Sequence, residues 1–293
     1  MPVRTMPFWK YLLLEAYYRG SLPYRWLRAA QARAAGMAPV MVLFYHRIAD
    51  DAASPWTMSN REFAAQIRWL QRRFEMISLE EARRRLMEKS NRTPVVSITF
   101  DDGYDANCDE ALPLLIERKI PCTYFVSSRC VLERVPFPHD VAERCSVRPN
   151  TLAQLRNLAD AGIEIGAHTR THADIGRLHN PREIDDQVAG SGRELEQALG
   201  QRVRYFAFPY GQPRNMNPLA FQIAREHGYD AVCSAYGGYN IPGDDPFHIQ
   251  RIFPDNMPRL KNWVTGDPRK TCRPYRYNYQ VQPQAALEEV AIA

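Results

Sequence analysis

The sequence predicts an α/β fold, a distorted (β/α) barrel of parallel strands with fewer than eight regular units. Apolar runs of strand length alternate along the chain with segments of helical periodicity. These runs are almost continuously apolar, which is typical of parallel strands covered by helices. Gly162 and Gly228 stand just past two of the expected helices, where a left-handed residue ends a helix. The same alternation also allows an open doubly wound sheet, which is the alternative fold.

The regular elements begin at Val40, where "VMVLFYH" predicts a buried strand over 40–45. Ser59 and Ser78 each precede a glutamate by three residues, the pattern of a capping box, and an expected helix follows each of them. Further strands are expected over 94–100, 120–127, 163–167, 203–208, 229–234 and 248–253, and further helices over about 105–118, 151–161, 181–199 and 216–227.

The prediction divides the chain into three segments. Residues 1–36 are a basic amphipathic extension, residues 37–265 form the domain that carries the candidate chemistry, and residues 266–293 are an irregular tail. Residues 128–150 are too long for a simple connection and are a candidate lid. The six cysteines include no C-x-x-C pair, which predicts reduced thiols rather than a cysteine metal site.

The formal charge of +5 resides in the extension, where six Lys and Arg residues accompany one acidic residue, Glu15. The rest of the chain is therefore net neutral, which argues against binding to nucleic acid. The apolar run over 11–14 is too short for a signal peptide or a membrane span, so the expected location is cytoplasmic. Two interpretations of the extension stay open. Its Arg, Trp, Tyr and Leu content favours peripheral contact with the inner face of a membrane, and the alternative is packing on the protein's own body.

Three short stretches stand at expected strand ends: Asp101-Asp102, "GAHTRTH" with His168 and His172, and "FAFPYGQ". In parallel α/β folds the carboxyl ends of the strands carry the reactive residues. Two imidazoles and one carboxylate are a common metal-ligand set that leaves open positions. A bound divalent ion would neutralise one aspartate, so that its neighbour can stay ionised as a base. Taken alone, the aspartate pair could be a helix cap, and the spacing of the two histidines could occur by chance. The two motifs together favour a metal site.

The stretches "TFDDG", "HTRTH" and "FAFPYG" together resemble the polysaccharide deacetylase (NodB-homology) family of metal-dependent carbohydrate deacetylases. The resemblance runs from about Pro39 to Arg251 and also covers "FYHRI". It implies the barrel of that family, a divalent metal ion with Zn²⁺ expected, and a loop whose backbone helps to hold an oxyanion. The implied residues are Asp101 as the base, Asp102, His168 and His172 as metal ligands, and Pro209, Tyr210 and Gly211 as the substrate-binding loop.

The chain departs from the family pattern at two positions. Most members place the catalytic acid in a late Leu-x-His segment, which has no clean match here. One branch of the family uses an early Tyr-His motif, and its match makes His46 the preferred acid over His248 and Tyr45 a substrate contact. Many members carry an arginine two residues before the proline, where this chain has Ala207. Arg251 is the candidate to supply that charge to the base, and a rim salt bridge is the alternative interpretation.

The resemblance implies a hydrolase that removes N-acetyl groups from an amino-sugar-containing glycan or glycan precursor and releases acetate. The expected substrate is an N-acetylated glycan or a lipid-linked amino sugar. Two alternatives keep the same scaffold, an O-acetyl esterase and a non-catalytic glycan-binding protein. A glycosidase would also need two carboxylates, but it would not need the histidine pair.

Overall fold

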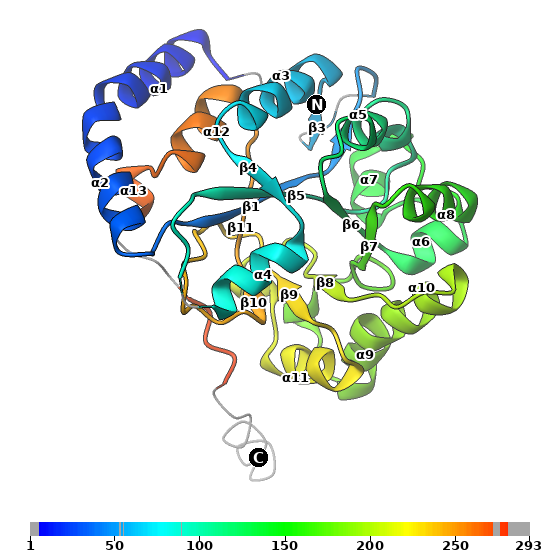
Figure 1. The fold of residues 1–293 in the computed structure, drawn as a ribbon. Helices are drawn as coiled ribbons and strands as arrows, with labels where there is room; N and C mark the ends of the chain where they lie inside the picture. Colours follow the sequence, from blue (N-terminus) through cyan, green and yellow to red (C-terminus); the bar gives the residue numbers. More distant parts are fainter. Residues whose placement is uncertain (1–5, 53, 55, 89, 272–275, 281–293) are drawn as a thin grey trace, which may run out of the picture.

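The computed structural model describes residues 6–52, 54, 56–88, 90–271 and 276–280. Its centre is a parallel sheet that curves into a nearly closed barrel, with helices around it (Figure 1). The strand order is β10-β9-β8-β7-β6-β5-β1-β11, and β4 pairs with the first half of β5. The α/β barrel prediction is therefore confirmed. The strands are β1 Val40–Tyr45, β4 Glu75–Ile77, β5 Val95–Phe100, β6 Cys122–Val126, β7 Glu164–Ala167, β8 Tyr205–Ala207, β9 Ala231–Cys233, β10 His248–Ile249 and β11 Arg251–Ile252.

The helices alternate with these strands as the sequence pattern predicts. They are α1 Phe8–Gly20, α2 Leu22–Ala34, α3 Asn60–Gln71, α4 Leu79–Met87, α5 Ala111–Glu117, α6 Ser128–Leu132, α7 Pro138–Glu143, α8 Leu152–Asp160, α9 Pro181–Asp185, α10 Ser191–Leu199, α11 Pro218–His227, α12 Met257–Val264 and α13 Pro268–Thr271. Two further short strands, β2 Arg47–Ile48 and β3 Thr57–Met58, form a separate pair. The side chains of Ser59 and Ser78 accept the N–H groups of Glu62 and Glu81, which confirms both predicted caps.

The two faces of β1 contribute to different parts of the core. Val40 and Val42 belong to an inner cluster, whereas Met41, Leu43 and Tyr45 pack with the surrounding helices. This division follows from the alternation of side chains along a strand. Apolar residues of α4 join the inner cluster, and α4 crosses the front of the barrel in Figure 1. The candidate site lies at the carboxyl ends of the strands.

Three predicted elements differ in the structure, two of them for identifiable reasons. The helix expected over 105–118 is a 3₁₀ turn at Asp105–Cys108 followed by α5, in which Pro113 occupies the first turn that tolerates it. The last strand is broken between β10 and β11, because the N–H of Gln250 donates to the side chain of Asn240. The helix expected over 181–199 contains a π-turn at Asp186–Gly190.

The first and last segments that the structure describes pack against the rest of the protein. Helices α1 and α2 pack beside α12 at the edge of the molecule (Figure 1). From the predicted irregular tail, the ring of Tyr279 stacks on Phe221 of α11, with 4.1 Å between the ring centroids. Among the described residues, no helix has the length and apolar character that a membrane span needs. The five described cysteines are free thiols, and Cys272 lies outside the described residues.

Candidate metal centre and active site

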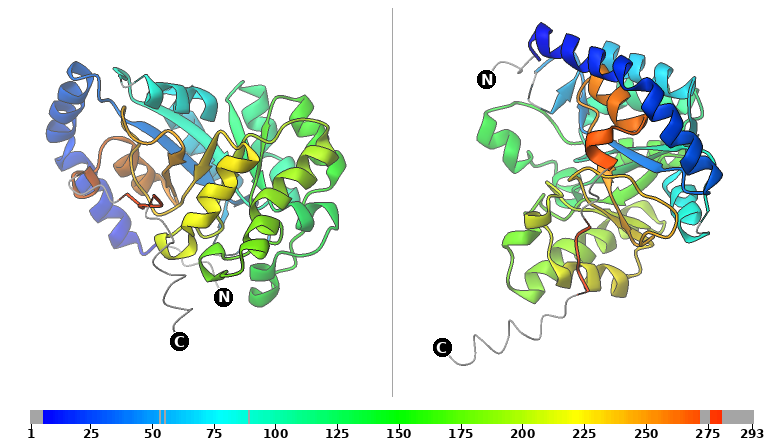
Figure 2. Two further views of the ribbon diagram at one scale, coloured as in Figure 1. Left: turned by 90° about the horizontal axis from the view of Figure 1, so that it is seen from below. Right: turned by 90° about the vertical axis from the view of Figure 1, so that its left-hand side faces the viewer.

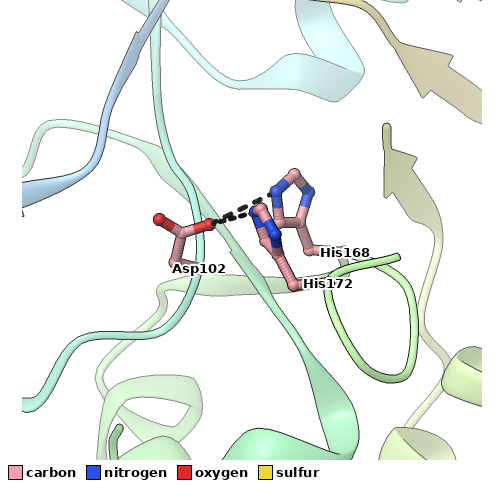
Figure 3. Close-up of side chains that lie close together, drawn as sticks. All are labelled: Asp102, His168 and His172. Carbon is pink, nitrogen blue, oxygen red and sulfur yellow. Dashed lines mark ion pairs between the residues drawn. The ribbon is translucent and has the colours of Figure 1, made fainter. Parts of the chain in front are cut away.

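Asp102, His168 and His172 meet at the carboxyl end of the barrel, as Figure 3 shows. Asp102 follows β5 and the two histidines follow β7, so the ligands come from strands separated only by β6. Oδ1 of Asp102 lies 3.1 Å from Nε2 of His172 and 3.4 Å from Nε2 of His168. All three side chains are buried. Parallel strands therefore bring together residues that lie 66 and 70 positions apart in the sequence, from 102 to 168 and 172.

The donor atoms of this group fit a divalent cation. The Ala207 carbonyl lies 2.8 Å from Nδ1 of His168 and can only accept a hydrogen bond, so the lone pair of Nε2 faces Asp102. Oδ1 of Asp102 is buried and has no hydrogen-bond partner among the described residues. Burial acts to raise the pKa of Asp102, but the two facing imidazoles hold that pKa well below its usual range. A buried carboxylate oxygen that faces two imidazole nitrogens indicates a metal site.

Ser127 holds the two metal-ligand loops in register. It follows β6, the strand between them, and its N–H donates to the carbonyl of Asp102 over 3.0 Å. Its hydroxyl donates to the carbonyl of His168, also over 3.0 Å. The spacing of the ligands therefore depends on the same strand order that builds the barrel.

Three predicted site residues have left-handed backbone conformations, which non-glycine residues rarely adopt. Their φ angles are +76° for Asp102, +58° for His172 and +60° for Tyr210. Each such residue costs on the order of 1–3 kcal/mol unless its surroundings compensate, and such residues concentrate at functional sites. Gly211 follows with a φ of +53°, and a Cβ atom there would lie 2.5 Å from the backbone nitrogen of Ala235. The loop at 209–211 is thus restricted to its present shape.

Asp101 is paired with Arg251 inside the barrel. Nη1 and Nη2 of Arg251 lie 2.6 Å and 2.8 Å from the two carboxylate oxygens, a bidentate ion pair. The guanidinium also donates to Thr99 and to the carbonyl of Ser234, and it has no exposed surface. Burial acts to lower the pKa of Arg251, but the charge of Asp101 outweighs it and raises that pKa. Arg251 of β11 therefore gives Asp101 a buried cationic partner.

His46 lies at the rim of the same end of the barrel, directly after β1. Its ring contacts Trp56 and Phe253, with centroid distances of 5.0 Å and 5.8 Å. Burial lowers the pKa of His46, and the charges of Asp102 and Asp101 act in the opposite direction. His248 lies elsewhere: its Nε2 contacts the hydroxyl of Ser234 at 2.9 Å, and burial lowers its pKa to about 4.

The structure contradicts the predicted substrate contact of Tyr45. Its side chain is 1% exposed and its hydroxyl donates to Gln66 of α3, so it belongs to the layer between barrel and helices. The physical reason is the alternation along β1, which turns Tyr45 outward while its neighbour lies at the site. Tyr210, in contrast, is 49% exposed, and its ring lies 5.1 Å from that of His172.

The candidate lid segment 128–150 contributes a histidine, His139, that belongs to none of the sequence motifs. Nε2 of His139 lies 3.8 Å from Oδ2 of Asp102, and its ring centroid is 4.4 Å from that of His172. The hydroxyl of Tyr104 contacts His139 and donates to Asp140, which ties α7 to the turn after β5. Burial lowers the pKa of His139 to about 4. The only sequence signal for His139 is the unusual length of its segment, because His139 does not belong to a spaced pair of candidate ligands.

The comparisons with known proteins agree with this site. A polysaccharide deacetylase family model matches residues 88–232, which include Asp101, the three candidate ligands and the 209–211 loop. The chain is similar to a chitooligosaccharide deacetylase of Bradyrhizobium sp. (strain ANU 289), with 30% identity over 139 residues, 47% of this chain and 55% of that protein. It is 25% identical to YxkH of Bacillus subtilis (strain 168) over 217 residues, 73% of this chain and 71% of that one.

Among solved structures, that of IcaB from Ammonifex degensii is similar to this one with a TM-score of 0.65. The two chains are 26% identical, and the similarity covers 78% of this chain and 98% of the other. His46 and Arg251 lie outside the segment that the family model matches, so their assignment depends on geometry.

Proposed function

The chain belongs to the polysaccharide deacetylase family, and from this premise we propose that it hydrolyses the N-acetyl group of an amino sugar and releases acetate. The observation that carries the proposal is the pairing of two adjacent aspartates with different partners. Asp102 faces two imidazoles, and Asp101 faces a buried guanidinium. Asp102 is thus placed to bind a cation, and Asp101 is held beside it as a separate anion.

We assign Asp102, His168 and His172 as ligands of Zn²⁺, an ion for which two imidazoles and one carboxylate are a familiar set. When bound, such an ion supplies Lewis acidity toward the acetyl carbonyl and an acidified water. The Ala207 carbonyl fixes the tautomer of His168 for this purpose.

The remaining steps belong to side chains and backbone of this chain. Asp101, held by Arg251, takes one proton from the water that attacks the acetyl carbon. The backbone N–H of Tyr210 donates to the oxyanion that forms. His46 gives a proton to the sugar nitrogen, so that the C–N bond breaks and a neutral amine leaves. The products are acetate and a free amino sugar.

Exposed aromatic side chains near the site support a sugar substrate. Trp56 is 41% exposed beside His46, and Tyr210 is 49% exposed beside His172. Aromatic rings offer flat apolar surface with little conformational freedom to lose, which suits the apolar face of a pyranose. We propose an N-acetylated glycan or a lipid-linked amino sugar as the substrate.

Metal removal tests this function directly. Acetate release from a panel of N-acetylated sugars, polymeric and lipid-linked, is expected to fall to background with a chelator and to return with added Zn²⁺. His172→Ala should lose the metal, measured by mass spectrometry on purified protein, together with activity. His227→Ala, a histidine of α11 outside the site, is the matched control and should keep both. Undiminished activity after chelation would refute the proposal, and acetate release from O-acetylated sugars alone would assign the esterase instead.

His46→Gln separates amide from ester hydrolysis. We expect acetate release from an N-acetyl sugar to fall about 10²-fold to 10⁴-fold, with metal content unchanged, because an amine leaves poorly without a proton. Hydrolysis of an activated acetate ester, whose leaving group needs no proton, should fall far less. Burial lowers the pKa of His46 below 6.5, and an acid acts when protonated. The amide rate of the parent protein should therefore fall as pH rises through that pKa, and the variant should lack this decline. A variant with lowered metal content would reassign His46 as a ligand.

A further inference from the structure

Helices α1 and α2 turn their apolar side chains to the solvent. Phe8 is 75% exposed, Trp9 58% and Leu13 60% on α1, while Trp26 is 67% and Leu27 58% exposed on α2. With Leu12, the residues of α1 stand at positions 8, 9, 12 and 13, which is one face of a helix. Figure 2, right, shows both helices along one side of the molecule.

Three polar residues of the same helices, Glu15, Tyr17 and Arg25, point inward. Glu15 pairs with Lys261 of α12 at 3.1 Å, and the hydroxyl of Tyr17 donates to Asp267. Arg25 is buried, and its guanidinium donates to the carbonyl and side chain of Asn262. A surface helix ordinarily buries its apolar face and exposes its polar one. Here specific polar contacts hold the two helices with their apolar face toward the solvent, so this exposure is part of the folded structure.

The charges around this face are positive. Lys10, Arg19, Arg28 and Arg33 are exposed on the two helices. Glu15 is the only acidic residue of the first 36, and it contacts both Arg19 and Lys261. Apolar and aromatic side chains flanked by Lys and Arg are the composition of helices that lie in the surface of an anionic membrane. A purely apolar protein partner would gain nothing from the four cations.

We propose that the outward face of α1 and α2 docks on an anionic lipid bilayer, with Phe8, Trp9, Leu13, Trp26 and Leu27 inserted at the interface. The cations then lie at the level of the lipid headgroups. Such docking is peripheral, since neither helix meets the requirements for a span. It is independent of the proposed deacetylation, because the barrel and its site are complete without this face.

Vesicle binding of the full chain tests the proposal. The protein should cosediment with vesicles of phosphatidylcholine that contain phosphatidylglycerol, and much less with phosphatidylcholine alone. High salt should weaken the binding, because it screens the cations. The double variant Trp9→Glu and Leu13→Glu should lose about tenfold or more of its partitioning, because it removes two insertions and adds two negative charges. Met87→Glu, a 52% exposed apolar residue of α4, is the matched control and should bind as the parent does.

Two results would overturn the proposal. One is equal partitioning of the double variant and the parent, or no binding by either. The other is self-association of the parent in sedimentation velocity that the double variant abolishes, which would assign the face to a second copy of the chain. Acetate release from a soluble substrate should be the same in the parent and the double variant. Loss of bilayer binding and loss of the proposed activity are therefore separate outcomes.

Discussion

Asp101→Asn is expected to lower kcat for acetate release by about 10³-fold, because a carboxamide cannot take the proton of the attacking water. The substitution keeps the size of the side chain and leaves the three candidate metal ligands in place. Metal content, measured by mass spectrometry, should therefore stay at the level of the parent. This combination, metal kept and turnover lost, distinguishes a base from a ligand.

The partly exposed pair of Asp105 and Arg148 provides the control for this prediction. Asp105 lies three residues after Asp102, and its carboxylate is 3.0 Å from Nε of Arg148, whose side chain is 76% exposed. Asp105→Asn changes the same functional group near the site but outside it, so kcat should stay within about twofold of the parent, as surface ion pairs contribute little. Full turnover in Asp101→Asn with metal bound would remove Asp101 from the mechanism.

The part of this site that the sequence could predict is the part that depends on strand ends. A β-branched run followed by Asp101 and Asp102, and a second run followed by His168, are local patterns. Parallel pairing then brings their carboxyl ends to one edge, whatever the length of chain between them. The three candidate metal ligands come together as expected. The resemblance, with Ala207 where many members carry an arginine, likewise points to Arg251 as the replacement cation, although only the structure gives the bidentate contact.

The features that could not be predicted depend on contacts without a local pattern. His139 reaches the metal ligands because α7 folds back over the site, and nothing in the order of residues 128–150 specifies that return. The break in the last strand depends on the side chain of Asn240, ten residues before Gln250. The Tyr-His motif predicts that Tyr45 lies at the site beside His46, whereas the alternation of side chains along β1 turns its ring away from the site.

Arg251→Met is expected to lower the free energy of unfolding by about 3–5 kcal/mol, because it leaves the charge of Asp101 buried and unpaired. It should also lower kcat by about 100-fold with metal content unchanged, since the base is no longer held in line with the water. Arg251→Lys keeps the charge but cannot make two parallel contacts, so its loss of stability and rate should be intermediate. Urea denaturation and steady-state kinetics measure the two effects.

The double variant Asp101→Asn with Arg251→Met gives the decisive comparison, because part of the lost stability should return whereas the lost activity should not. Removing both charges eliminates the unpaired ion that each single variant leaves, so the double variant should be destabilised by clearly less than the sum of the singles. Its turnover should stay as low as that of Asp101→Asn, since the base is still missing. The same cycle on Asp105 and Arg148 should show a coupling of at most about 1 kcal/mol, because solvent reaches this pair through the largely exposed Arg148. Additive losses in the buried pair would mean that Arg251 stabilises the barrel without acting through Asp101.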